Sequence, residues 1–163
     1  MRVSRVITCV AKAYRLVNAL DPPDAAYIAG LVDGEGTVTL SRLHRNENRR
    51  VVVCISNNDL VLLQHVKDKI GAGRITAKRV YNPRHAPSFN YQINSRQALE
   101  VLRQIVMYMR SYKLDRARLA LRDYLRLTPR NGRYTTELMA ARRIFEATLL
   151  SIGPRRCSGT KAP

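Results

Sequence analysis

The chain has 163 residues, enough for one domain with its own hydrophobic core. Its 29 basic and 12 acidic residues give a net charge of +17, which favours a polyanionic partner such as nucleic acid. No run of about 18 apolar residues occurs, so we expect no membrane-spanning helix and no membrane partner. Cys9, Cys54 and Cys157 are odd in number, widely spaced and without a CxxC pair, which favours free thiols over a disulfide framework or a zinc site.

Residues 1–20 contain basic side chains and no acid, and their apolar residues keep helical spacing. We therefore expect a basic amphipathic helix over residues 3–18 that forms an extension of the domain. An organellar presequence is the alternative for this composition. The extension is favoured, and together with the unpaired cysteines it predicts an intracellular, reducing compartment, a prokaryotic cytoplasm or nucleoid rather than an organelle.

The next segment predicts a helix from about Pro23 to Asp33, because prolines suit a first helical turn and acids suit a helix N-terminus. One side of this helix is an apolar stripe, and another is a narrow stripe of small residues. The small stripe consists of Ala26, Ala29, Gly30 and Asp33. Small residues bury little apolar area but let two helix backbones come very close. This stripe therefore predicts a close helix–helix contact.

The end of this helix combines glycines with acids. Gly34 and Gly36 are expected to supply the permissive dihedral angles of a helix end. Asp33 and Glu35 lie where the helix dipole already concentrates negative charge. Carboxylates there are unfavourable without a nearby cation, so the sequence predicts a divalent metal at this end.

The rest of the chain predicts an α+β fold in a domain spanning residues 21–152. We expect strands over 37–43, 50–56, 74–80 and 89–94, with a helix between the second and third that ends at 71–73. Helices are expected over about 95–109, 113–127 and 135–151, followed by a disordered tail over 153–163. Each strand has one apolar and one polar face, and the polar faces are rich in basic and amide side chains. Such a sheet suits readout of base edges in the major groove.

Residues 28–36 resemble the signature of the LAGLIDADG homing endonucleases: Ala29, Gly30, Leu31, Asp33 and Gly36 agree, and Glu35 keeps the acid. The resemblance extends over roughly residues 22–152. It implies the LAGLIDADG αββαββα fold, with a four-stranded antiparallel DNA-binding saddle sheet and C-terminal helices. For the signature alone, the alternative is a glycine-terminated helix with two acids of no special role.

The resemblance implies a site-specific double-strand DNA homing endonuclease that hydrolyses phosphodiester bonds with Mg²⁺, or Mn²⁺, and with Ca²⁺ as a non-cleaving substitute. Glu35 is then the metal-binding acid, and Gly34 contributes its backbone carbonyl. Asn57 replaces a glutamine that orders solvent near the metals in this family. Lys113 corresponds to a basic residue near the scissile phosphates; a solvated lysine at a helix start is the alternative.

The signature occurs once, so the resemblance implies a homodimer on a long pseudo-palindromic target, with Ala26, Ala29, Gly30 and Asp33 at the interface. The polar strand faces are expected to contact DNA. The candidates are Thr37, Thr39, Ser41, Arg50, Cys54, Ser56, Arg74, Thr76, Lys78, Asn90 and Gln92. Two other functions suit the same charge and fold: an intron RNA maturase, with intron RNA as partner, and a non-cleaving DNA-binding regulator.

Overall fold

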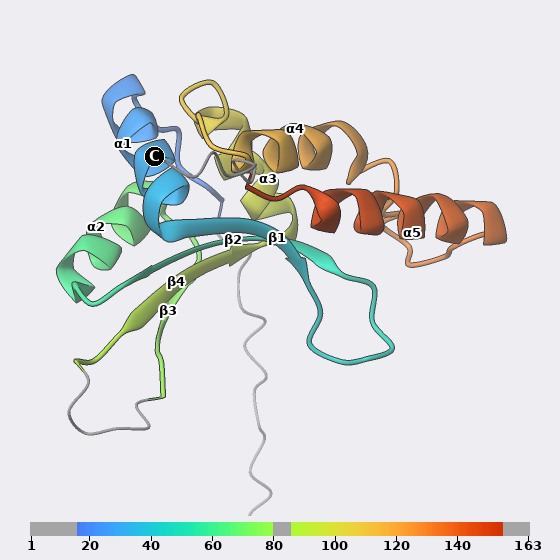
Figure 1. Ribbon diagram of the computed structural model, residues 1–163, viewed down its shortest axis with the longest axis horizontal. Helices are drawn as coiled ribbons and strands as arrows, with labels where there is room; N and C mark the ends of the chain where they lie inside the picture. The colour runs from blue at the N-terminus through green and yellow to red at the C-terminus, as the bar shows by residue number, and fades with distance from the viewer. Residues whose placement is uncertain (1–15, 80–85, 155–163) are drawn as a thin grey trace, which may run out of the picture.

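The computed structural model describes residues 16–79 and 86–154. In chain order they form α1 (Pro22–Glu35), β1 (Gly36–Ser41), β2 (Arg50–Asn57), α2 (Leu60–Ile70), β3 (Arg74–Ala77), β4 (Phe89–Asn94), α3 (Ser95–Ile105), α4 (Lys113–Asp123) and α5 (Thr136–Ser151). The predicted αββαββα order and α+β class are confirmed, and α4 and α5 are the predicted C-terminal helices (Figure 1).

Several predicted element ends differ from the structure. The third strand ends at Ala77, and the two helices expected to reach residues 109 and 127 end at Ile105 and Asp123. Residues 16–18 are not helical, so the predicted N-terminal helix is wrong there, and residues 3–15 lie outside the described part. Of the predicted tail, only residues 153 and 154 are described. Apolar spacing continues past these helix ends because the following turns also pack on the core.

Local sequence signals account for where α1 and α2 begin and where α2 ends. The side chain of Asp21 accepts a hydrogen bond from the backbone N–H of Asp24, which caps α1. The side chain of Asp59 likewise caps the first turn of α2. α2 ends at Gly71, whose φ of 75° is the left-handed conformation that glycine adopts without strain.

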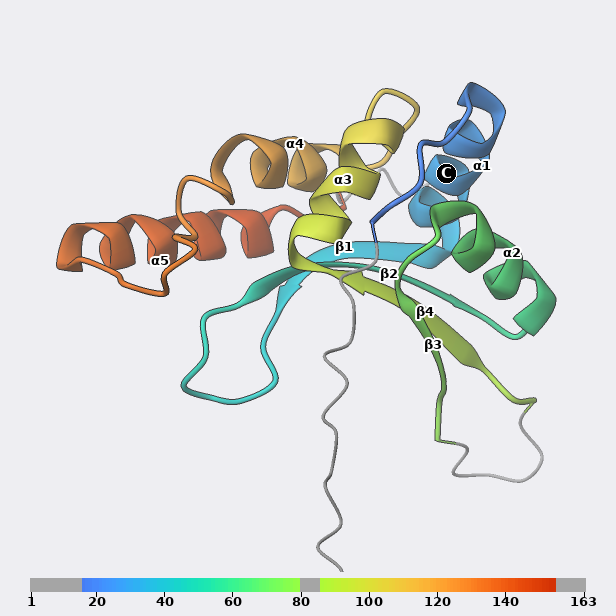
Figure 2. The same ribbon diagram turned by 180° about the vertical axis from the view of Figure 1, so that it is seen from behind.

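The four strands form one antiparallel sheet in the order β1-β2-β4-β3. The register aligns residues of one face in rows across the sheet. One such row contains Thr37, Cys54, Gln92 and Arg74. Figures 1 and 2 show the helices on one side of this sheet and the β1–β2 loop extending toward the other side. Among the described residues, no helix covers the other face of the sheet.

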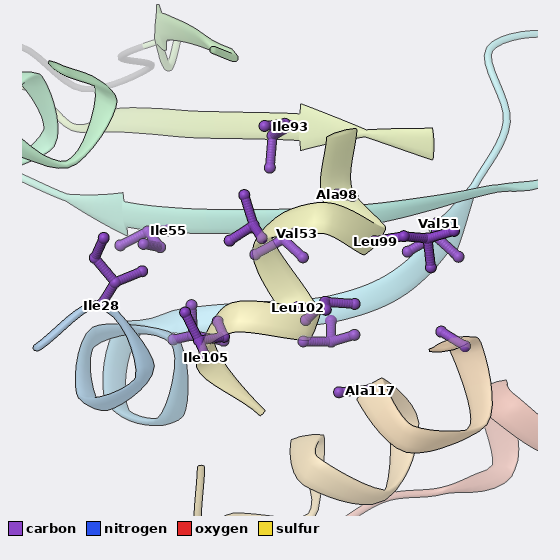
Figure 3. Packing of buried hydrophobic residues seen from close by; sticks show 14 of the residues in the cluster. Ile28, Val51, Val53, Ile55, Ile93, Ala98, Leu99, Leu102, Ile105 and Ala117 are labelled. Carbon is purple, nitrogen blue, oxygen red and sulfur yellow. The ribbon is translucent and has the colours of Figure 1, made fainter. Parts of the chain in front are cut away.

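The core lies between the sheet and the helices. Figure 3 shows Ile28 of α1, Val53 and Ile55 of β2 and Leu102 and Ile105 of α3 meeting there, and each is at most 1% exposed. This burial of apolar area is the main favourable contribution to folding. Because the core lies on one face only, β1 and the second half of β4 alternate between buried and half-exposed residues, as the sequence predicts. The edge strand β3 has no buried residue, and β2 departs from the alternation because Val52, on the open face, is also buried. Within the described residues, no helix is long and apolar enough to cross a membrane.

Candidate nucleic-acid interface and active site

The open face of the sheet is lined by polar and basic side chains. All the residues predicted to contact DNA belong to it: Thr37, Thr39, Ser41, Arg50, Cys54, Ser56, Arg74, Thr76, Asn90 and Gln92 in the strands, and Lys78 beyond the end of β3. None of them is buried. Asn94 shares this face but was not among the predicted contacts, although the same alternation marks it. Their contact with DNA itself stays a prediction.

Hydrogen bonds between side chains, both across two strands and along one strand, hold part of this face in place. The hydroxyl of Ser56 donates to Oδ1 of Asn90 at 3.0 Å, and Nε2 of Gln92 donates to Oδ1 of Asn94 at 2.9 Å. Cys54 lies near the middle of the face, and burial raises the pKa of its thiol above the ordinary value. The centre of the face therefore presents uncharged groups, with Arg50 at the start of β2 and Arg74 on the edge strand β3.

α1 meets β1 at Gly36, and this glycine is required by close packing rather than by its dihedral angles. Its φ is −102°, an extended conformation open to any residue, so the predicted role of Gly36 is wrong. A Cβ atom there would lie 2.6 Å from Cα of Val32 and 2.9 Å from the carbonyl oxygen of Cys54. Gly34 lies within the helix, and a Cβ there would meet nothing within 4 Å. The predicted dihedral role is therefore wrong for Gly34 as well, and close packing requires a glycine only at position 36.

Lys113 closes the C-terminal end of α1. Its side chain is only 6% exposed, and Nζ donates to the carbonyl oxygens of Val32 at 3.0 Å and Asp33 at 2.8 Å. Burial lowers the pKa of Lys113, while the nearby charges of Asp33 and Glu35 oppose that shift. The alternative of a solvated lysine is therefore wrong. The ammonium group places positive charge at the end of α1. The divalent metal predicted at this end, and the predicted place of Lys113 near the scissile phosphates, stay predictions.

Asp33 is bound to the segment between α3 and α4. One carboxylate oxygen accepts the backbone N–H groups of Arg110 at 2.6 Å and Ser111 at 3.3 Å, and the other accepts the hydroxyl of Ser111 at 2.6 Å. These intrachain bonds use the carboxylate that the sequence assigned to the dimer interface. Lys113 and Asp33 together hold the last turn of α1 in place, which in turn orients the residues that follow.

Glu35, the last residue of α1, projects differently from Asp33. It is exposed, and within the described residues its carboxylate makes no hydrogen bond or ion pair. The described residues contain no cluster of three or more acidic, histidine or cysteine side chains that could hold a metal ion. Hard divalent cations prefer oxygen ligands, and Glu35 with the carbonyl of Gly34 offers two of that kind. The donor set fits such a cation but needs further ligands.

Asn57 is the last residue of β2 and lies two residues beyond Ile55, the strand partner of Gly36. Asn57 therefore lies at the end of β2 that is closest to the C-terminus of α1. Its Oδ1 accepts the backbone N–H of Asp59 at 2.9 Å, which forms the turn into α2. Its amide NH₂ group remains for solvent. The predicted solvent-ordering role is untested, and the structure adds a turn-forming role that the sequence analysis missed.

The residues of the predicted small stripe on α1 do not all face the same surroundings. Ala29 is fully buried in the chain's own core, so its assignment to the interface is wrong. Ala26, Gly30 and Gly34 are exposed, and they follow one another at intervals of one helical turn. A Cβ at Gly30 would meet nothing within 4 Å. The exposed stripe is thus Ala26, Gly30 and Gly34.

No protein-family model and no curated protein matches the chain. Solved structures of similar fold do. The homing endonuclease I-CvuI, in complex with its target, is 14% identical with a TM-score of 0.66, covering 84% of this chain and 86% of that one. The archaeal intron-encoded homing endonuclease I-Vdi141I, complexed with DNA, is 16% identical with a TM-score of 0.59, covering 85% and 88%.

A third structure differs in its length. The LAGLIDADG meganuclease I-AabMI, bound to uncleaved DNA, is 20% identical with a TM-score of 0.58, and the match covers 82% of this chain but 46% of that one. The present chain therefore matches nearly all of the first two proteins and about half of this one. With the element order and sheet topology described above, these likenesses show that the chain has the fold of the LAGLIDADG homing endonucleases.

Proposed function

We propose that the chain is a site-specific homing endonuclease that cleaves double-stranded DNA as a homodimer on a long pseudo-palindromic target. The observation that carries the proposal is the exposed, unbonded carboxylate of Glu35 beside an open polar sheet face. The structures of similar fold include homing endonucleases bound to their DNA targets. The reducing interior of a prokaryotic cell suits a chain whose Cys54 is a free thiol.

Glu35 and the carbonyl of Gly34 would hold a divalent cation, which we take to be Mg²⁺, with Mn²⁺ as an alternative and Ca²⁺ as a non-cleaving substitute. One of the similar structures was obtained with Mg and another with Ca. Such a cation supplies an activated water and stabilises the leaving oxygen. Lys113 and Asp33 hold the end of α1 in position, so both act on Glu35 by placing it. Asn57, at the end of β2 near Glu35, would orient solvent around the cation.

Two copies are needed because, in the described part of the chain, Glu35 belongs to no group of three or more side chains that could hold a metal ion. The exposed stripe of Ala26, Gly30 and Gly34 would let two α1 helices pack closely, which brings the two Glu35 residues to the same stretch of DNA. A match to about half of I-AabMI supports this, because that protein has room for two such units. C₂ symmetry then requires a pseudo-palindromic target.

The test of cleavage uses the full chain on a plasmid library of intron-free candidate sites, with Mg²⁺, Ca²⁺ or EDTA. We expect linearisation at one site with Mg²⁺ only. Glu35→Gln should lower cleavage at least about a hundredfold while DNA binding persists. Glu137→Gln, which changes an exposed acid at the start of α5, is the matched control and should cleave normally.

Cleavage that persists in Glu35→Gln would overturn the assignment of the metal ligand. Tight binding without cutting at any site would instead support an intron RNA maturase or a non-cleaving regulator. Neither alternative is favoured by the similar structures above, which are named as homing endonucleases or meganucleases.

The test of assembly is sedimentation of Gly30→Leu. A Cβ atom at this position would meet nothing within 4 Å in the described part of the chain, so the monomer should fold, but the bulk of leucine would separate the two α1 helices. We expect a dimer in the wild type and a monomer in Gly30→Leu. Ala147→Leu enlarges an exposed position on α5 and should leave the dimer intact. A dimer unaffected by Gly30→Leu would place the interface elsewhere.

A further inference from the structure

A pocket lies at the end of the sheet farthest from Glu35. β1 begins directly after Glu35 and runs away from it, so Ser41 and its strand partner Arg50 lie at the far end. There a pocket of about 260 Å³ is bordered by the starts of β2 and α3, the end of α4 and part of α5. Four arginines line it, namely Arg49, Arg50, Arg96 and Arg142.

Arg142 of α5 is a rigid part of this pocket. It is only 2% exposed, and Nη1 donates to the carbonyl of Leu127 at 2.8 Å and to the hydroxyl of Thr128. Nη2 donates to the backbone carbonyl of Arg49, and Nε donates to Glu146. These bonds within the chain hold the guanidinium in one orientation, so Arg142 forms a fixed, positively charged wall of the pocket.

Positive charge exceeds negative charge around the pocket. The carboxylate of Glu146 serves two guanidinium groups, since its second oxygen lies 3.5 Å from Nε of Arg49. Arg50 is 3.6 Å from Glu47 in an exposed pair, which contributes little. Within the described residues, the guanidinium of Arg96 forms no hydrogen bond or ion pair. The excess positive charge in a partly enclosed space favours an anion.

The start of α3 adds backbone donors to the same pocket. Ser95 and Arg96, its first two residues, both line the pocket. The N-cap residue, Asn94, makes no side-chain hydrogen bond to the first turn. Backbone N–H groups at a helix start and guanidinium forks are both suited to bind phosphate oxygens.

We propose that this pocket binds a phosphate group, and that the phosphate belongs to the DNA backbone at the outer end of each half-site. The choice of DNA as the source rests on the proposed function. Arg50 belongs both to the pocket and to the open face, so the two surfaces are continuous. With α1 at the dimer axis, the pocket lies at the outer end of the face. Its contact is to backbone and therefore independent of base sequence.

The test measures binding of two probes by the full chain and by two variants, Arg96→Ala and Arg49→Ala. Arg49→Ala keeps the backbone carbonyl that holds Arg142. The probes are a duplex of arbitrary sequence, titrated over a range of salt, and inorganic phosphate at constant ionic strength. We expect each variant to bind duplex about tenfold more weakly, with the slope of log K against log salt reduced by about one. Phosphate binding should be lost.

The matched control is Arg143→Ala, which removes the same charge from an exposed position on α5 outside the pocket. Its duplex affinity should change by less than about twofold. Loss of phosphate binding with duplex affinity equal to this control would overturn DNA as the source and assign free phosphate. Unchanged binding of both probes would overturn the phosphate site. A wild type that binds phosphate but no duplex would refute the proposed function and leave only the phosphate chemistry.

Discussion

Two cations are buried in the described part of the chain, Lys113 at the end of α1 and Arg142 in α5, and they are held in different ways. Both donate to backbone carbonyls near a helix C-terminus: Lys113 to the last turn of α1, and Arg142 to Leu127, which follows α4. Lys113 has two such acceptors and no ion pair within hydrogen-bonding distance among the described residues. Arg142 has carbonyl, hydroxyl and carboxylate acceptors together.

The difference follows from the shapes of the two groups. A guanidinium carries five donors in a planar fork, so Arg142 can join three segments of chain at once, whereas an ammonium is a compact point charge. Arg142 therefore acts mainly as a structural link, next to a pocket with excess positive charge. Lys113 holds the last turn of α1, directly before Glu35. The following substitutions test this comparison.

The largest effect is expected for Arg142→Met. It removes the buried cation from a partly buried ion pair and leaves the carbonyls of Leu127 and Arg49 without their donor. The free energy of unfolding should fall by about 3–5 kcal/mol, measured by urea unfolding. Arg143→Met, at an exposed position of the same helix, should change it by less than about 0.5 kcal/mol. Equal losses of unfolding free energy in the two variants would show that Arg142 does not link these segments of the chain.

A smaller effect is expected for Lys113→Met, which fills similar space but leaves the carbonyls of Val32 and Asp33 unpaired. The free energy of unfolding should fall by about 2 kcal/mol near neutral pH. Lys67→Met on α2, where the lysine is half-exposed, is the control and should be nearly neutral. If both lysine variants unfold at the same urea concentration, the bonds to α1 contribute nothing measurable.

The same pair of proteins gives a pH test. Burial lowers the pKa of Lys113 below its ordinary value of 10.5, so the unfolded chain holds this proton more tightly than the folded chain. Stability from this group therefore rises as pH increases through the alkaline range just below 10.5. Over that range the wild type should gain free energy of unfolding relative to Lys113→Met. A constant difference would mean that the lysine is not desolvated.

The smallest effect is expected for Ser111→Ala. It removes the 2.6 Å hydroxyl bond to Asp33 but keeps the two backbone N–H bonds to the same carboxylate. The free energy of unfolding should fall by about 1 kcal/mol. Ser151→Ala removes a hydroxyl bond to Thr148 at the exposed end of α5 and should cost less. A larger loss for Ser151→Ala than for Ser111→Ala would show that the bond between Ser111 and Asp33 contributes little to stability.

The sequence by itself determined the features that depend on neighbours along the chain. The alternation of residues in β1, β2 and β4 set which side chains share the open face, because successive strand residues point to opposite sides. Asp21, Asp59 and Gly71 marked helix ends through contacts within a few residues. The signature around Glu35 then pointed to the fold that the structure has.

Only the tertiary structure decided the features that join distant segments. Whether Ala29 packs on its own core or on a partner depends on what covers that side of α1. Lys113 reaches carbonyls about eighty residues away, and Gly36 is required because Cys54 of β2 approaches it. Arg142 joins α5 to the start of β2 in the same way. Spacing along a chain does not encode such meetings, because they depend on how whole elements pack.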